Sequence, residues 1–263
     1  KYHLKGEGKL NINDTYVFDT GKNEWSNYTT WPPKNISEVK YYFQPDEKLN
    51  KQVAIIQNSF SEYLNDPSNP IPYTAKFEDS KSFYNEVHLI EDQRYISSRP
   101  DVLTFETEVL TQDVTIAGPI IANLFVSTTG TDADFVVKII DVYPDNENDP
   151  DPNPAQVEMG GYERLVRTEI MRGKFRNSYE FPEPFDPNKI TEVKINLNDA
   201  FHTFKSGHKI LVQVSSSYFP FFDVNPNTFC DIYSADKDKF VKAMIKIYHN
   251  KDFASSISFK ILK

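Results

Sequence analysis

The sequence predicts an all-β protein, a jelly-roll β-sandwich with long loops and at most one or two short helices. Aromatic residues, which favour strands, are abundant, with 20 Phe and 15 Tyr among 263 residues. In the second half of the chain, apolar residues recur at every second position, which is the period of a half-buried strand. Turn residues separate these runs at short intervals, as in sandwiches, and almost no stretch has helical spacing.

The first residues, KYHLKGEG, resemble the end of a helix that stops at Gly6 and Gly8. Because the chain opens at the end of a helix, we expect it to be a fragment of a longer polypeptide. Residues 1–13 are then the remnant of the last helix and linker of a preceding domain. Residues 14–263 form the sandwich.

Short apolar runs after the linker predict the first strands, at TYVFDT (residues 15–20) and VKYYF (residues 39–43). The pattern then loosens between residues 45 and 100. Prolines interrupt helices and ladders there, at Pro67, Pro70 and Pro72. We expect loops in this third of the chain.

Regular alternation begins at Asp101, where Leu103, Phe105, Thr107 and Val109 share one face of a predicted strand. Further strands are predicted at VTIAGPIIANLFVSTT (114–129), DFVVKIIDVYP (134–144), ITEVKINL (190–197), GHKILVQVSSS (207–217) and SISFKIL (256–262). The second of these is apolar on both faces, as a central strand is. The pair Gly118-Pro119 is expected to bend the first or to place it at a sheet edge. Only residues 231–243 have the pattern of a short helix.

The charge balance excludes some partners. Lys and Arg number 29 against 38 Asp and Glu, a net charge of −9, whereas a nucleic-acid surface needs clustered basic residues. No apolar run reaches the roughly 18 residues of a membrane helix, and the N-terminus has no signal-peptide core. We expect no nucleic-acid or membrane partner. The single Cys230 forms neither an internal disulfide nor a cysteine metal cluster.

The sequence contains no motif of a known catalytic or cofactor site. None of its nine glycines forms G-x-S-x-G, a P-loop or G-x-G-x-x-G. Its five histidines include no zinc-binding pair, and His202 and His208, which flank a predicted turn, are expected to hydrogen-bond there. We expect no catalytic residue, no metal and no cofactor. A triad of unrelated geometry remains an alternative.

Several acidic residues have a structural explanation. Asp141, between Ile140 and Val142, is expected to be buried and paired with Arg167 or Arg172. The acids Asp132 and Asp134 follow Gly130 and are expected to bond backbone amides at a turn and strand entry.

The acidic loop from Asp145 to Gln156 resembles the start of a calcium loop. It has Pro150 where such loops need Gly, and Gln156 where they need a bidentate Glu. A solvated loop is the preferred interpretation, and its role is unassigned.

Three long segments resemble a known family. They are RPDVLTFETEVLTQDVTIAGPIIANLFVSTTGTDADFVVKIIDVYPD (99–145), GGYERLVRTEIMRGKFRNS (160–178) and FKSGHKILVQVSSSYFPFFDVNPNT (204–228). Together with the upstream NEW…WPP and DPSNPIPY, they resemble the C-terminal domain of the X-Pro dipeptidyl-peptidase and cocaine-esterase (CocE/NonD) hydrolases. The GGY and DVNPNT stretches are most similar to the α-amino acid ester hydrolases, often labelled glutaryl-7-aminocephalosporanic acid acylases.

This resemblance implies a galactose-binding-domain-like jelly roll that is not itself catalytic. In the family a Ser-Asp-His triad lies in an upstream α/β-hydrolase domain, so none of its residues maps onto this chain. The chain is then expected to pack on the catalytic α/β-hydrolase domain of the same polypeptide and to form part of the cleft wall. A bacterial, periplasmic or secreted enzyme acting on esters, β-lactam amides or X-Pro peptides is favoured, and a homo-oligomer remains open.

Two sets of aromatic residues are candidates for contacts with that domain. By resemblance, the loop carrying Tyr73, Phe83 and Tyr84 faces the substrate cleft, and the alternative is that these rings plug the end of their own sandwich. Trp25 and Trp31 are candidates for domain docking. The rival hypothesis is a free-standing carbohydrate-binding module in which the two tryptophans form an exposed sugar platform.

Overall fold

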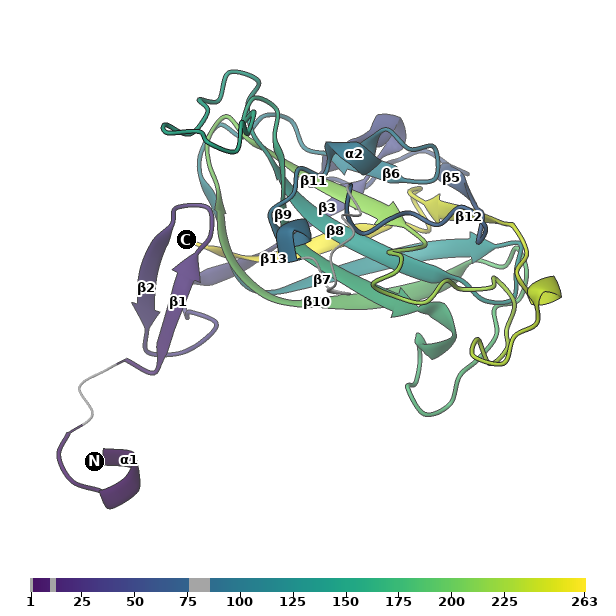
Figure 1. Cartoon of the computed structure of the whole chain (residues 1–263), viewed down its shortest axis with the longest axis horizontal. Helices are drawn as coiled ribbons and strands as arrows, with labels where there is room; N and C mark the ends of the chain where they lie inside the picture. Colours follow the sequence, from purple (N-terminus) through teal and green to yellow (C-terminus); the bar gives the residue numbers. More distant parts are fainter. Residues whose placement is uncertain (1, 10–12, 76–85) are drawn as a thin grey trace.

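The computed structural model describes residues 2–9, 13–75 and 86–263. Two antiparallel sheets pack face to face, and a separate two-stranded hairpin projects from one end (Figure 1). Helix is confined to α1 (Tyr2–Lys5), α2 (Arg94–Ser97) and a few short 3₁₀ turns within the described residues. The predicted all-β jelly-roll sandwich is therefore confirmed.

The larger sheet has seven strands. Its order is β4 (Leu49–Asn50), β3 (Ile36–Phe43), β13 (Ser256–Leu262), β7 (Val114–Thr128), β12 (Ala243–Tyr248) and β5 (Phe60–Asn65), with β10 (Thr191–Phe204) on the other side of β7. The four-stranded sheet has the order β6 (Leu103–Glu106), β11 (Lys209–Ser215), β8 (Asp134–Val142) and β9 (Glu163–Arg172). The hairpin consists of β1 (Thr15–Asp19) and β2 (Glu24–Tyr28).

The core lies between the two sheets and follows the alternation of the sequence. On β10 the predicted inward residues Val193, Ile195 and Leu197 are fully buried. Across the core, the rings of Phe43 and Phe105 stack with centroids 4.3 Å apart. Burial of this apolar surface is the main stabilising contribution to the fold.

The outer faces of the two sheets differ. The outer face of the seven-stranded sheet carries charged residues such as Lys194. The segment that contains α2 covers the outer face of the four-stranded sheet, with Gln93 bonded to Lys138 of β8 and Ser97 bonded to Gln213 of β11. As predicted, β8 is a central strand buried on both faces, flanked by β11 and β9.

The pair Gly118-Pro119 lies in the middle of β7. The strand runs unbroken between β10 and β13, so its expected placement at a sheet edge is wrong. The pairing registers of both neighbouring strands shift near Pro119, which donates no hydrogen bond. Gly118 has φ 133°, and a Cβ there would lie 2.9 Å from the side chain of Pro32.

The helix expected at residues 231–243 is absent, and only a 3₁₀ turn at Lys237–Lys239 forms there. Residues outside this segment hydrogen-bond its backbone groups instead. Lys239 O accepts from Thr228 Oγ1, while the backbone amide of Val241 donates to Pro226 O. These long-range bonds replace helical ones, which the local spacing alone did not reveal.

The N-terminal helix α1 ends at Lys5, and the expected stop residue Gly6 follows it with φ 66°. The division into a helical remnant and a sandwich stays a prediction. No helix among the described residues is both long and apolar enough to cross a membrane.

Candidate functional site

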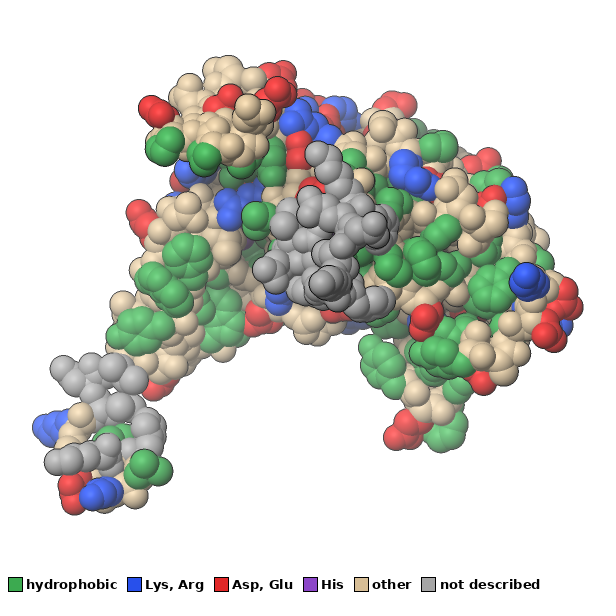
Figure 2. All heavy atoms as spheres, in the orientation of Figure 1, with side chains coloured by type: hydrophobic (Ala, Val, Ile, Leu, Met, Phe, Trp, Pro, Cys, Tyr) green, Lys and Arg blue, Asp and Glu red, His purple; other side chains and the backbone are tan. Residues whose placement is uncertain are grey.

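The projecting hairpin has two chemically different faces. Strand pairing sets Phe18 opposite Trp25, with ring centroids 5.3 Å apart, and places Tyr16 on the same side. Tyr16, Phe18 and Trp25, here called the hairpin face, have exposed fractions of 53%, 37% and 71%. Figure 2 shows hydrophobic side chains gathered at this projecting end. Such clustering of aromatic rings in solvent is typical of an interaction surface.

The opposite face of the hairpin is anchored on β10. Buried Asp19 accepts the backbone amides of Gly21 and Thr203, each at 2.9 Å, and the Thr203 hydroxyl. The amide of Thr20 donates to Phe201 O at 3.2 Å. These bonds fix the hairpin, so that the hairpin face is presented in one orientation.

The two tryptophans lie on different surfaces. Trp31 packs edge-on against Phe201, with centroids 5.8 Å apart, and its indole Nε1 donates to Asp199. Trp25 instead points away from the sandwich beside Phe18. The two rings therefore do not form one flat sugar platform, and the docking role stays a prediction.

A second aromatic cluster surrounds Tyr73 on the four-stranded side. Tyr73 exposes 3% of its surface and contacts His88, Tyr218 and Phe221, with ring centroids 5.2, 6.0 and 5.9 Å away. Its amide donates to Phe219 O. Tyr73 therefore packs within its own domain in this chain. The other two predicted cleft residues, Phe83 and Tyr84, lie outside the described residues.

A cavity of about 460 Å³ lies beside this cluster and shares Phe221 with it. Exposed aromatic rings of Tyr179, Phe222 and Tyr233 surround it. Arg172 also lines it, and is held by an ion pair to Asp134. The lining is mostly aromatic and apolar, with Arg172 and Asp223 as its charged residues, which suits an aromatic group.

Asp141 is buried as expected, but its partners are not arginines. Its two carboxylate oxygens contact His202 Nε2 at 3.2 Å and His208 Nδ1 at 2.8 Å. Burial raises the pKa of Asp141, but hydrogen bonds from both imidazoles outweigh burial and lower it. The expected arginines bond elsewhere: Arg167 to Leu197 O and Arg172 to Asp134. His208 precedes β11, which pairs with β8, and His202 lies on β10, which the packing of the two sheets brings to Asp141.

A hydroxyl, an imidazole and a carboxylate line up at this cluster. Thr20 Oγ1 lies 2.8 Å from His202 Nδ1, and His202 contacts Asp141 through its other nitrogen. This order matches a catalytic triad. However, His202 exposes only 1% of its side chain, so no substrate reaches the imidazole in this arrangement. We interpret it as a structural link between the hairpin and the sandwich.

The acids near Gly130 behave partly as expected. Asp132 accepts the backbone amides of Ala133 and Lys174, as a turn residue does. Burial and the neighbouring charge of Asp134 raise the pKa of Asp132 to about 6. Asp134 instead interacts with side chains: it forms an ion pair with Arg172 and accepts a hydrogen bond from Asn225.

Lys138, in the middle of β8, is a buried lysine that was not predicted from the sequence. Its Nζ donates to Gln93 Oε1 at 2.7 Å and lies 4.6 Å from the ring centroid of Tyr218. Burial lowers the pKa of Lys138 to about 7. A lysine inside the apolar run DFVVKIIDV was the sequence signal for it.

Side chains of the acidic loop hydrogen-bond the backbone of the residues that follow it. Asp149 Oδ1 accepts the amide of Met159, and Asn153 bonds both backbone groups of Val157. In the described part of the chain, no group of three or more His, Cys, Asp or Glu is arranged to hold a metal ion.

Comparison with known proteins identifies the family. The model of the X-Pro dipeptidyl-peptidase C-terminal non-catalytic domain matches residues 10–258. Cocaine esterase from Rhodococcus sp. (strain MB1 Bresler) is 31% identical over 99% of this chain and 44% of its own length.

Two solved structures agree with that match. An aminopeptidase from a marine sediment archaeon (Thaumarchaeota archaeon) covers the whole chain with TM-score 0.90 and 36% identity. An α-amino acid ester hydrolase covers 98% with TM-score 0.87 and 34% identity. The chain spans 42% of each of these proteins and less than half of the curated relative. The chain belongs to the family of X-Pro dipeptidyl-peptidase C-terminal non-catalytic domains.

Proposed function

We propose that this chain is the C-terminal domain of a CocE/NonD-type serine hydrolase and packs on an α/β-hydrolase domain of the same polypeptide. The hydrolase activities that its relatives' names state, and the fraction of those relatives that it spans, support this proposal. The parent enzyme works by acyl transfer, in which a serine attacks a carbonyl carbon and water then releases the acyl group. Its substrates are α-amino acid esters, β-lactam amides or X-Pro peptides.

The hairpin face is the single observation that carries the docking part of this proposal. Tyr16, Phe18 and Trp25 expose large rings on a rigidly anchored element. Aromatic residues are enriched at the buried centres of interfaces because they bury much apolar area with few rotatable bonds. The hairpin also extends away from the sandwich, toward the N-terminal segment (Figure 1).

The aromatic cluster around Tyr73 supports the cleft-wall part of the proposal. Phe221 joins this buried cluster to the cavity lined by Tyr179 and Tyr233. In the complete enzyme this surface, together with Phe83 and Tyr84, forms one wall for the aromatic part of a substrate. Tyr73 then acts from behind by holding Phe221 in place.

Active-site labelling of the complete polypeptide tests the proposed reaction. A fluorophosphonate bonds covalently to an activated serine, and mass spectrometry locates the modified residue. We expect a single modified serine outside residues 1–263, together with loss of p-nitrophenyl ester hydrolysis. A label on a serine within residues 1–263, or full esterase activity without any label, would refute the proposal.

A further inference from the structure

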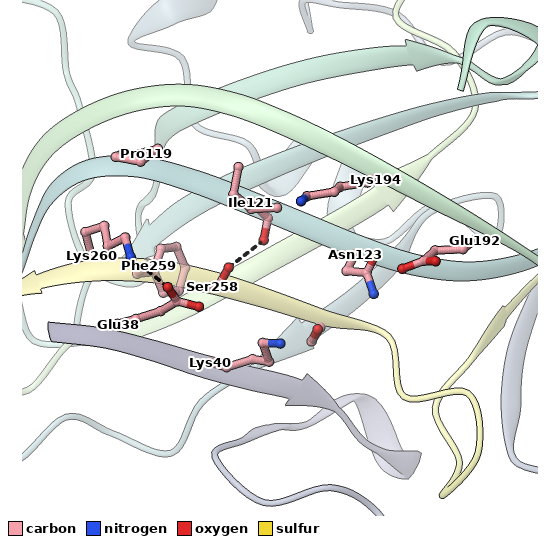
Figure 3. Close-up of a pocket in the computed structure, with 11 residues that line it drawn as sticks. Glu38, Lys40, Pro119, Ile121, Asn123, Glu192, Lys194, Ser258, Phe259 and Lys260 are labelled. Atoms are coloured by element: carbon pink, nitrogen blue, oxygen red, sulfur yellow. Dashed lines mark hydrogen bonds and ion pairs between the residues drawn. The ribbon is translucent and has the colours of Figure 1, made fainter. Parts of the chain in front are cut away.

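A polar trough crosses the outer face of the seven-stranded sheet. Its volume is about 380 Å³, and it extends over β3, β13, β7 and β10 (Figure 3). Small-molecule sites in proteins have volumes of about 300–1,000 Å³. Most of the outward-facing side chains that line it are polar, with Pro119 and Ile121 as the apolar ones, while the inward-facing neighbours fill the core. The trough therefore has the size of a ligand site and a lining suited to a polar ligand.

The two rims of the trough carry the same pair of charges. Glu38 and Lys40 lie on β3, and Glu192 and Lys194 lie on β10. In Figure 3 the side chains of Lys40 and Lys194 extend into the hollow from opposite sides. A ligand lying across the sheet would meet one ammonium group at each rim.

One ion pair is made within the trough, and two lysines remain available. Lys260 Nζ lies 2.7 Å from Glu38. Lys40 Nζ lies 6.0 Å from the ring centroid of Tyr42. Among the described residues, neither Lys40 nor Lys194 forms an ion pair. The hydrogen bond and charge of Lys260, with the charges of Lys40 and Lys194, lower the pKa of Glu38. The lysines thus make the trough attractive to a negative charge.

The floor of the trough contains an oxygen that lacks a donor. Asn123 Oδ1 is buried, and no described residue donates a hydrogen bond to it. Nearby, the Ser258 hydroxyl donates to Ile121 O at 3.3 Å. Buried acceptors in folded proteins are nearly always satisfied, by protein, water or ligand. A ligand hydroxyl is a suitable donor for Asn123.

The trough also disfavours a neutral sugar. Neutral sugars are held largely by stacking on exposed aromatic rings, and the aromatic residue that lines this trough, Phe259, is fully buried. Three lysines against two glutamates leave a local positive charge in a chain whose net charge is −9. The ligand must therefore combine negative groups with hydroxyls.

We propose that this trough binds an oligosaccharide containing uronic acids. Carboxylates of successive sugar units pair with Lys40 and Lys194, and a hydroxyl donates to Asn123 Oδ1. Glu192 accepts a second hydroxyl but repels the carboxylates. The trough lies on the outer face of the seven-stranded sheet, whereas Tyr73 packs on the four-stranded sheet. A further hollow shares Lys194 with the trough and Tyr179 with the aromatic cavity.

Titration of the 263-residue chain with a trimer of galacturonic acid tests the proposal. Calorimetry gives the affinity, and the NMR signals of the Asn123 side-chain amide report the place of binding. We expect Lys40→Gln and Lys194→Gln each to weaken binding about five- to tenfold, as loss of one charge-assisted hydrogen bond does. Glu192→Gln is expected to strengthen it, because a like charge is removed. Lys205→Gln, an equal charge change in a distant turn, is the control.

Other outcomes would overturn the proposal. Equal binding of a neutral galactose trimer would show that carboxylates are not recognised. Equal binding of inorganic phosphate would reduce the trough to a general anion site. No binding at millimolar ligand, or equal weakening by Lys205→Gln, would remove the site altogether.

Discussion

Lys138 lies in a row of polar residues that crosses the outer face of the four-stranded sheet. Its register neighbours are Gln213 on β11 and Thr168 on β9. Among the described residues, Gln213 Oε1 and Thr168 Oγ1 are buried without a hydrogen-bond partner. A buried lysine in such surroundings is costly to charge, because its ammonium loses the hydration it has in the unfolded chain.

Lys138→Met is expected to stabilise the chain at neutral pH. The folded pKa of Lys138, about 7, lies below the usual lysine value of 10.5, so the protein must give up a proton or bury a charge to fold. The penalty is complete below pH 7 and disappears as pH rises to 10.5. The shift corresponds to about 5 kcal/mol at most. Allowing for the orphaned Gln93, we expect a gain of about 1–3 kcal/mol at pH 7.

Urea unfolding at pH 7 and pH 9.5 measures this effect. The free energy of unfolding of the parent chain should rise more steeply between these values than that of Lys138→Met. The charges of Glu91 and Glu163 raise the pKa of Lys138 and so oppose the effect of burial. Lys205→Met is the exposed control. Parallel pH profiles for the parent and Lys138→Met would show that Lys138 stays charged in the folded chain.

At the scale of elements, the contact between the hairpin and β10 depends on one glycine. A Cβ on Gly21 would lie 1.9 Å from the carbonyl oxygen of Thr203, and Gly21 has no left-handed φ that would itself require glycine. Gly21→Ala therefore disturbs this contact alone. We expect a loss of about 1–3 kcal/mol in the free energy of unfolding, as in other overpacked sites.

Hydrogen exchange locates the effect of Gly21→Ala. The amides of Thr20 and Thr203 bond across the contact, so both should exchange faster in the variant. Lys22→Ala, in the same turn but exposed, should leave both rates unchanged. Unchanged exchange at both amides in Gly21→Ala would mean that the hairpin tolerates the extra methyl group without moving.

Hydroxyl-radical footprinting tests whether the hairpin face is covered in the complete polypeptide. Trp25 should be oxidised quickly in the 263-residue chain, because its ring is largely exposed. In the complete polypeptide its oxidation should fall about tenfold or more, while the packed Trp31 changes little. Equal oxidation of Trp25 in both proteins would exclude docking through this face.

The elements that were predictable from sequence are those whose periodicity and burial agree. On β10 the alternation of Val193, Ile195 and Leu197 alone places their side chains in the core. The partners of Asp141 were not predictable, because His202 and His208 lie more than 60 residues away. His202 meets Asp141 through packing of the two sheets, and His208 through the pairing of β8 with β11. The helix expected at residues 231–243 failed for a similar reason, since distant residues bond its backbone.

At the scale of the whole molecule, exposed aromatic rings and exposed charges lie on different parts of the surface. The hairpin face and the aromatic cavity expose rings, and the trough on the outer face of the seven-stranded sheet exposes charges. Of these exposed rings, the sequence predicted only Trp25 as a candidate, and it did not predict the trough. Its residues come from four strands widely separated along the chain, and only their register brings them together.

The 263-residue chain by itself is expected to hydrolyse no ester. The triad-like arrangement found among the described residues, Thr20, His202 and Asp141, is closed to substrate, and His208 occupies the second carboxylate oxygen. Incubation with p-nitrophenyl acetate or phenylglycine methyl ester should give the rate of buffer alone. Thr20→Val should leave that rate unchanged and lower the free energy of unfolding by about 1 kcal/mol, through loss of one hydrogen bond. Saturable turnover that Thr20→Val abolishes would make these residues an active site, and turnover that survives it would place one elsewhere in the chain.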